Sequence, residues 1–312
     1  MNLEQLRSFT EVARLGHFTR AAEGLHVTQP SLSRQIATLE TELGVELFHR
    51  ARGNIALTAA GERLLPRARR MLTDAESARA EMAELAGLRA GRVRIGATPT
   101  LCTSLVAETL TGFRARYPGV EVEILERGSR SLIASLAEGA LDLALIVDTE
   151  APAAAFDTLD RTPMLTERLV VVERAEGGAI SASMPVTLDQ LAATPQVMFP
   201  DSYDLHTTMS RAFKAAGLSP VVAVHGAEMD ASLRFVERGL GVAVVPAMVA
   251  LDRPLLRAHP LADPALSRTV SFARRADMTL THAGAAMRDA LLATTAQLTA
   301  AGAVTARFVS RA

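Results

Sequence analysis

The 312-residue chain contains one cysteine, Cys102, and no run of eighteen uninterrupted apolar residues. A single cysteine excludes a disulfide within one chain and a zinc site rich in thiolates, so we expect a reducing compartment. Without a long apolar run we expect no membrane span. The first residues, MNLEQLRSFTEVARLGHF, also lack the continuous apolar core of a secretory signal, and we therefore expect a cytoplasmic protein.

The patterns that mark common enzymes are also missing from the sequence. Seven histidines are scattered without HExxH spacing, and neither a Gly-rich phosphate loop nor a GxSxG elbow is present. Catalysis would fall to Cys102, His206 or His225, for which we favour a core or surface role. The sequence therefore predicts no enzyme activity, no catalytic or metal site and no cofactor.

Charge is divided unevenly along a chain whose net charge is −1. Residues 1–72 hold ten arginines and no lysine against seven acidic residues, whereas the rest holds 23 basic and 27 acidic residues. Residues 1–72, which we call the head, are therefore mildly basic. Such a charge fits a nucleic-acid partner, although solubility alone can explain it. The length predicts two or three folding units.

Three helix starts are predicted in the first thirty residues. Asn2, with Gln5 three positions later, forms the pattern of a capping box, and Gly16 ends that helix. Thr19 and Thr28 are each followed by helical spacing and are expected to cap the second and third helices. Two short helices joined by a tight turn are typical of a helix-turn-helix, and an ordinary helical hairpin is the alternative.

The third helix has one apolar stripe and an opposite polar face. The stripe consists of Leu32, Ile36, Leu39 and Leu43. Gln29, Ser33 and Arg34 can reach base edges in a major groove, while Thr28 and Ser31 can hold phosphates. The predicted DNA-binding residues are Thr28, Gln29, Pro30, Ser31, Ser33, Arg34 and Thr38, together with Arg50 and Arg52 of the next segment.

Residues 46–58, ELFHRARGNIALT, predict a two-stranded wing around Gly53 and Asn54. Arg50 and Arg52 lie at its edge, where they can enter a minor groove or pair with phosphates. A solvated charged turn is the alternative interpretation.

A long helix is predicted after Thr58, with Pro66 expected to bend or locally break it. Seven residues of this helix alternate steps of four and three, which is typical of a coiled coil and favours dimerisation. They are Leu64, Ala68, Met71, Ala75, Ala78, Met82 and Leu85. A helix packed on its own domain is the alternative.

The head resembles a known family. Residues 6–50, LRSFTEVARLGHFTRAAEGLHVTQPSLSRQIATLETELGVELFHR, followed by ALTAAGERLLP, are similar to the winged helix-turn-helix of LysR-type transcriptional regulators. The resemblance implies a homodimer or homotetramer with paired heads on an interrupted inverted repeat of double-stranded DNA. It further implies that the rest of the chain, which we call the body, binds a small effector and switches transcription. RNA polymerase is implied as a further partner.

The body alternates strand-like and helix-like segments after two flexible points, Gly87 and Gly91. The predicted strands span residues 93–98, 120–126, 141–147, 168–173, 196–199, 221–226, 242–246 and 269–275, and the helices 100–116, 129–138, 203–216, 229–238 and 283–300. Such alternation predicts parallel sheets with right-handed crossovers. The two halves favour a hinged α/β clamp like the type 2 periplasmic binding proteins.

The predicted fold class is therefore an α+β multidomain protein. Its divisions are a winged helix-turn-helix over 1–58, a linker and dimerisation helix with hinge over 59–90, and an effector-binding domain over 91–312. Within the last, lobe I covers about 91–161 plus 267–302 and lobe II about 162–266.

Small ligands in such sheets bind at the carboxyl ends of strands. Thr98 and Thr100 bracket Pro99 there, beside free helical N–H groups, which favours an anion site. The predicted effector-binding residues are Thr98, Thr100, Leu101, Arg127, Ser129, Asp148, Ser202, Tyr203, Asp204, Glu228 and Met229, with His225 as a further candidate. Helix caps and rim positions are the alternative roles.

The expected effector is a small organic molecule that is polar or anionic, although Asp204 and Glu228 would repel a carboxylate if both face the cavity. A cytoplasmic small-solute receptor, or an enzyme that uses the two-lobed body, is the alternative function. The helix-turn-helix head favours the regulator over both.

Overall fold

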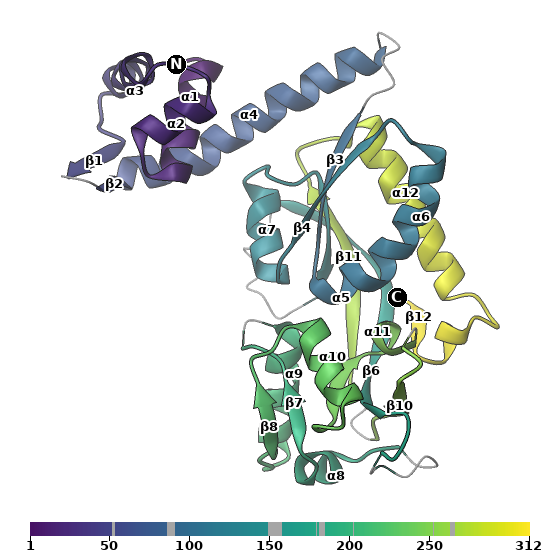
Figure 1. Ribbon diagram of the computed structural model, residues 1–312. Coiled ribbons are helices and arrows are strands. Elements are labelled where there is room, and N and C mark those ends of the chain that lie inside the picture. Colours follow the sequence, from purple (N-terminus) through teal and green to yellow (C-terminus); the bar gives the residue numbers. More distant parts are fainter. Residues whose placement is uncertain are drawn as a thin grey trace. The chain divides into compact units, whose positions relative to one another are not determined.

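A computed structural model describes residues 1–51, 54–85, 91–148, 158–178, 180, 185–201, 203–251, 253–262 and 266–312. The chain forms two compact units, one of residues 1–90 with 134–141 and the other of residues 91–133 with 142–312. Within these ranges, no helix has the length and apolar character needed to cross a bilayer. Figure 1 labels the elements of both units.

The first unit begins with three helices, a β-hairpin and one long helix. They are α1 (Leu3–Leu15), α2 (Phe18–Gly24), α3 (Gln29–Leu43), β1 (Phe48–Ala51), β2 (Asn54–Leu57) and α4 (Ala59–Leu85). β1 and β2 pair antiparallel, as predicted for the wing. The winged helix-turn-helix predicted from the sequence is therefore confirmed.

Two of the three predicted helix starts are confirmed by their caps. The Asn2 side chain accepts from the Gln5 N–H at 2.9 Å, and the Gln5 side chain accepts from the Asn2 N–H in return. Thr28 Oγ1 accepts from the Ser31 N–H at 3.4 Å. Thr19 is not a cap: α2 begins one residue earlier, and its N-cap His17 makes no side-chain cap hydrogen bond.

Packing of aromatic rings explains why α2 begins at Phe18. The Phe48 ring at the start of the wing lies 5.4 Å from Phe9 of α1 and 6.0 Å from Phe18 of α2, measured between ring centroids. Leu32, Ile36 and Leu39 are fully buried in the same core. This cluster fixes α3 and the wing to one rigid base.

Helix α4 starts as predicted, because Thr58 Oγ1 accepts from the Gly61 N–H at 3.1 Å. The helix continues through Pro66, so the predicted local break is absent. Ala68 is fully buried in the core of the head, and Leu64 packs against that core. These two residues, which were predicted to contact a second chain, therefore pack against the head of their own chain.

The second unit contains two lobes, each with its own apolar core. Lobe I contains β3 (Arg92–Ala97), α5 (Pro99–Leu101), a π-helical turn (Cys102–Val106), α6 (Ala107–Arg116), β4 (Glu121–Glu126), α7 (Ser129–Ala137), β5 (Leu143–Val147), β11 (Ser267–Arg275) and α12 (His282–Leu298). Lobe II contains α8 (Leu188–Ala193), β7 (Gln196–Met198), α9 (Asp204–Ala215), β8 (Val222–His225), α10 (Met229–Glu237), β9 (Ala243–Pro246), α11 (Ala247–Leu251) and β10 (Leu256–Pro260). Helices α6 and α12 lie beside each other in lobe I (Figure 1).

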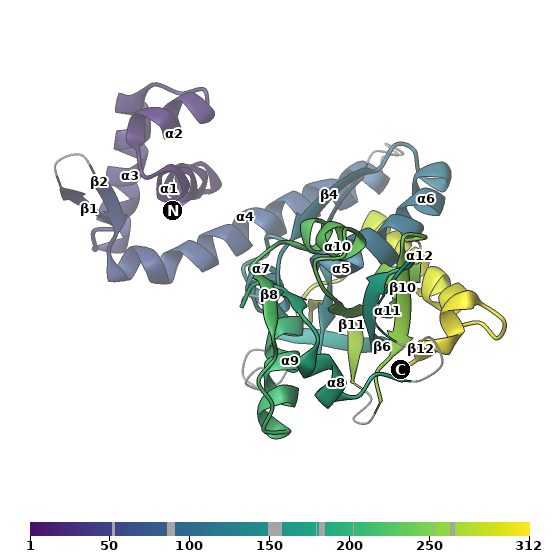
Figure 2. The same ribbon diagram turned by 60° about the horizontal axis from the view of Figure 1, so that its bottom comes forward.

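One long strand, β6 (Leu159–Arg174), connects the lobes. The sheet order is β10-β6-β11-β5-β3-β4, with β9 and β12 (Val309–Arg311) also paired to β6. β3 runs parallel to β4 and β5, as predicted, while β11 returns antiparallel to β5 and β6. Figure 2 shows β6 and β11 side by side where they pass between the lobes.

The division between the lobes on β6 falls later than the sequence predicted. Met164 and Leu165 pack in the core of lobe I, whereas Leu169 belongs to the core of lobe II. Residues 162–167 therefore belong with lobe I. β6 itself runs through both lobes, and the polar residues Thr166, Glu167 and Arg168 separate its two apolar stretches.

The C-terminal residues add elements that the sequence analysis did not assign. A 3-10 helix (Val304–Arg307) leads to β12 (Val309–Arg311), which pairs antiparallel with β6. Val309 is buried in lobe I, and Phe308 packs against both cores. The tail is thus an integral strand of the body.

Candidate functional site

The polar face of α3 is free of the head's own core. Gln29, Arg34 and Thr38 are exposed, and the backbone turn before them is held by His26 at φ +55°. Thr38 Oγ1 donates to the Arg34 carbonyl at 2.9 Å. Of the remaining predicted positions, Thr28 and Pro30 are exposed, while Ser31 and Ser33 are half-buried. The first turn of α3 therefore presents short polar side chains to solvent.

The wing packs against α1 and α2 through the ring of Phe48. Arg50 lies on β1, where its backbone pairs with Ile55. The side chain of Arg50 and the whole of Arg52 lie outside the described residues. Their contact with DNA stays a prediction from the sequence.

The predicted dimer positions of α4 beyond Ala68 differ in exposure. Met71 and Met82 are 42% and 59% exposed, and Ala75 is half-buried. Ala78 is exposed, while the Leu85 side chain lies outside the described residues. Large exposed methionines on a helix indicate a surface that another chain can cover.

A cavity of about 710 Å³ opens between the two lobes of the body. This volume lies within the range of small-molecule pockets. Seven of the predicted effector residues line it: Thr98, Thr100, Arg127, Ser129, Tyr203, Asp204 and Glu228. These seven residues therefore meet at one cavity, and their contact with an effector stays a prediction.

Three predicted effector residues have other surroundings, and a fourth is not described. Leu101 and Met229 are buried in the cores of lobes I and II, because each faces the sheet rather than the cavity. Asp148 does not line the cavity, since it accepts from Ser271 Oγ at 2.9 Å and pairs with Arg161. Ser202 lies outside the described residues.

The wall of lobe I carries two neighbouring threonine hydroxyls. Thr98 Oγ1 lies 3.3 Å from Thr100 Oγ1, and both residues are buried. Thr98 is the N-cap of α5, yet its side chain makes no cap hydrogen bond. A capping role therefore does not explain this hydroxyl. Ser129, in contrast, has a structural bond, because its Oγ accepts from the Val147 N–H at 3.0 Å.

Arg268 completes this wall, and the sequence analysis missed it. Its Nη1 donates to Thr100 Oγ1 at 2.7 Å, and its Nη2 donates to Glu167 Oε2 at 2.8 Å. Glu167 is fully buried, and its Oε1 accepts from the Met248 N–H at 2.7 Å. No local pattern marks Arg268, because its partners lie 168 and 101 residues away in the sequence.

The wall of lobe II is acidic and contains one tyrosine. Tyr203 donates its hydroxyl proton to Glu228 Oε2, and its ring stacks on Phe199 at 5.7 Å between centroids. Burial, and then the hydrogen bond to Glu228, raise the pKa of the Tyr203 phenol. Tyr203 therefore keeps its proton and acts as a hydrogen-bond donor at neutral pH.

The only cysteine lies behind the wall of lobe I in the π-helical turn. Burial, followed by the charge of Glu126, raises the pKa of the Cys102 thiol to about 12. A thiol with such a pKa is a poor nucleophile at neutral pH. Cys102 itself is half-buried against the core of lobe I.

Two family models match the chain and together cover both units. The model of the bacterial regulatory helix-turn-helix protein, lysR family, matches residues 3–62, and that of the LysR substrate binding domain matches residues 86–296. The chain belongs to the LysR family of transcriptional regulators. It is thus a DNA-binding transcriptional regulator with an effector-binding domain.

Individual LysR proteins resemble the chain over nearly their whole length. A probable nitrogen assimilation transcriptional activator of Synechococcus elongatus is 30% identical, over 87% of this chain and 88% of its own. A full-length OxyR variant from Pseudomonas aeruginosa has a TM-score of 0.70 at 25% identity and covers 99% of this chain and 98% of its own. Full-length CbnR, solved in complex with its target DNA, has a TM-score of 0.67 at 23% identity and covers 94% and 100%.

Proposed function

We propose that this LysR-type regulator binds an interrupted inverted repeat as a homodimer or homotetramer in the cytoplasm. Each head would place α3 in a major groove, because the polar face of α3 is partly exposed. Three of the four residues of its apolar stripe are fully buried, and the fourth, Leu43 at the helix end, is exposed. The exposed Met71 and Met82 of α4 support pairing with a second chain. The spacing of two paired heads would then set the spacing of the half-sites.

Different residues of the head would supply affinity and sequence preference. Gln29, Ser33 and Arg34 are proposed to contact base edges, since they extend from the first turns of α3. Thr28 and Ser31 lie at the helix start, where their hydroxyls are proposed to bind phosphates. Arg50 and Arg52 of the wing are proposed to add phosphate or minor-groove contacts.

The effector is proposed to be a small zwitterion, and the separation of charge across the cavity carries this proposal. The wall of lobe I contains Arg127, Arg130 and Arg268 against Glu126, whereas that of lobe II contains Asp201, Asp204 and Glu228. An anionic group would bind at Thr98, Thr100 and Arg268, and a cationic group would face Asp204 and Glu228. A purely anionic effector would meet repulsion from lobe II.

An effector that contacts the walls of both lobes would favour a closed arrangement of the lobes. β6 and β11 are the strands that cross between the lobes, and Arg268 lies on β11 directly opposite Glu167 on β6. A ligand held at Thr100 and Arg268 thus touches the crossing itself. We propose that the resulting change in the body alters the spacing of the heads through α4, which is a coupling between two distinct sites.

A DNA protection experiment tests the regulator directly. Full-length protein would be titrated onto DNA from upstream of its own gene, with random DNA as competitor and with salt varied. We expect protection of a discrete interrupted repeat that outcompetes random DNA. Binding that depends on salt but ignores sequence, as phosphate contacts alone would give, contradicts the assignment of α3 as a base-reading helix.

Thermal unfolding tests the chemistry of the effector. The full chain would be heated with an amino-acid panel, with a dicarboxylate and with a diamine, because a ligand that binds only the folded state raises Tm. We expect at least one zwitterion to raise Tm more than the other two classes. A rise with the dicarboxylate alone would contradict a cation-binding wall in lobe II.

A further inference from the structure

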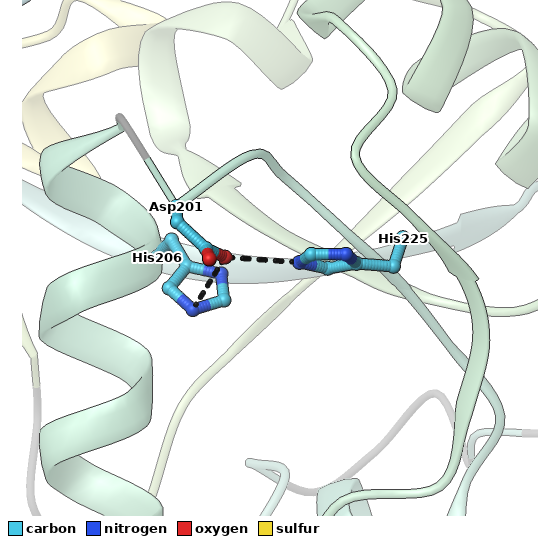
Figure 3. A group of neighbouring side chains, drawn as sticks. All are labelled: Asp201, His206 and His225. Carbon is cyan, nitrogen blue, oxygen red and sulfur yellow. Dashed lines mark hydrogen bonds and ion pairs between the residues drawn. The ribbon is translucent and has the colours of Figure 1, made fainter.

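Three metal-ligating side chains of lobe II meet at one point. His206 Nε2 lies 3.3 Å and His225 Nε2 lies 3.1 Å from the same Asp201 Oδ1. One ligand atom from each residue lies within 4.8 Å of the others. Figure 3 shows the Asp201 carboxylate between the two rings, with His206 coming from α9 and His225 from the end of β8. We propose that these residues bind a Zn²⁺ ion.

The hydrogen bond on the far side of the His206 ring supports this proposal. His206 Nδ1 lies 3.0 Å from the Phe199 carbonyl oxygen. A carbonyl only accepts, so with a metal ion on Nε2 the Nδ1–H of His206 would donate to this carbonyl. An N–H donated to a backbone carbonyl is the support that metal-bound histidines commonly have.

Both histidine Nε2 atoms reach the same carboxylate oxygen, so three possible ligand atoms surround one point. Zn²⁺ bonds of about 2.0 to 2.2 Å in a tetrahedron put ligand atoms roughly 3.4 Å apart. The distances of 3.3 and 3.1 Å to Asp201 Oδ1 are close to that separation.

The ligand set favours zinc over the common hard cations. Two imidazoles with one carboxylate suit Zn²⁺, whereas Ca²⁺ and Mg²⁺ prefer oxygen ligands. The site is open to solvent, because the side chains of Asp201 and His225 are 79% and 49% exposed. Three protein ligands would leave a fourth position for water or another ligand.

The metal would change the wall of the effector cavity. Asp201 is also a lining residue of that cavity, together with Asp204. A bound Zn²⁺ would neutralise the negative charge of Asp201 and connect α9 to the end of β8. The cavity would then accept anionic groups near lobe II more readily, so zinc would act as a second input to the regulator.

Calorimetric titration of the full-length chain, free of any affinity tag and of metal, tests the site with Zn²⁺ alone. We expect one equivalent of Zn²⁺ per chain. Asp201→Asn and His225→Ala should each weaken binding at least tenfold, whereas His17→Ala, which removes an exposed histidine of the head, should leave it unchanged. Co²⁺ in place of Zn²⁺ should give the visible absorption of a tetrahedral site in the wild type and lose it in both cluster variants.

Two results of these titrations would contradict the proposed zinc site. Absence of Zn²⁺ binding by the wild type would overturn the proposal. Binding that is unchanged in Asp201→Asn and His225→Ala would place the metal elsewhere. Thermal unfolding without metal would establish that both variants fold. No step uses DNA, so failure here leaves the proposed regulator function standing.

Discussion

Arg268 and Glu167 face each other on β11 and β6 and form an ion pair of 2.8 Å where these strands pass between the lobes. Glu167 has no exposed surface, and the Arg268 side chain is 12% exposed. Because Arg268 also donates to Thr100, the pair joins the connection between the lobes to the wall of the cavity. Stability of the body and effector binding therefore depend on the same guanidinium.

Removal of Arg268 should destabilise the body strongly. Arg268→Met leaves the buried Glu167 carboxylate without its cation, and breaking such a pair costs about 3 to 5 kcal/mol. Glu167→Gln in the same chain removes the stranded charge and should recover part of that loss. Denaturant unfolding of the two single variants and the double variant measures the coupling; strictly additive effects would contradict it.

Arg34 and Arg52 should differ in what they contribute to DNA binding. Arg34→Ala is expected to reduce the preference for the operator over random DNA by about 1 to 3 kcal/mol, because a base contact is lost. Arg52→Ala should weaken operator and random DNA similarly and lower the salt slope. Fluorescence anisotropy with both DNAs at several salt concentrations distinguishes these outcomes, and an equal loss of preference in both variants would refute the division.

Cys102 should be a poor redox sensor. With a pKa of about 12 in the folded chain, the thiol is protonated at pH 8. The folded protein should react with a thiol reagent at pH 8 at least about 100-fold more slowly than the unfolded protein, since only the thiolate attacks. Raising the pH toward 12 should speed the reaction. Rapid modification of the folded chain at pH 8, or loss of DNA binding on mild peroxide treatment, would contradict this.

The C-terminal strand should contribute to stability. Val309→Asp puts a charge where the side chain is 2% exposed and should destabilise the body by about 2 kcal/mol or more. Ser310→Asp changes the next, exposed residue of the same strand and serves as a matched control. Equal thermal unfolding of both variants would mean that β12 does not hold the lobes.

Local chemistry explains which parts could be predicted from the sequence. Asn2 and Thr28 bond to N–H groups three residues away, so their caps are visible in short patterns. Thr98 and Thr100 were predicted in the same way, from the end of one strand. The start of α2 was misplaced at Thr19, because the distant Phe48 ring influences it.

Contacts between distant segments explain which features could not be predicted from the sequence. Arg268 reaches Thr100 and Glu167 only because β11 returns beside β6, and no spacing in the sequence records that pairing. His206 and His225 come from separate elements and meet only at Asp201, so a search for closely spaced histidines missed them. Ala68 has the heptad spacing of a coiled coil but packs in the core of the head. The same spacing occurs in helices that pair with another chain and in helices that pack on their own domain.

Anisotropy of operator DNA with and without effector, in wild type, Thr100→Val and Thr103→Val, tests most directly whether the cavity controls the head. The effector would be the zwitterion that raises Tm most. Thr103 is an exposed neighbour outside the cavity and provides the matched control. We predict that wild type and Thr103→Val respond to the effector, while Thr100→Val keeps operator affinity within about 1 kcal/mol and does not respond. An undiminished response in Thr100→Val would contradict the account.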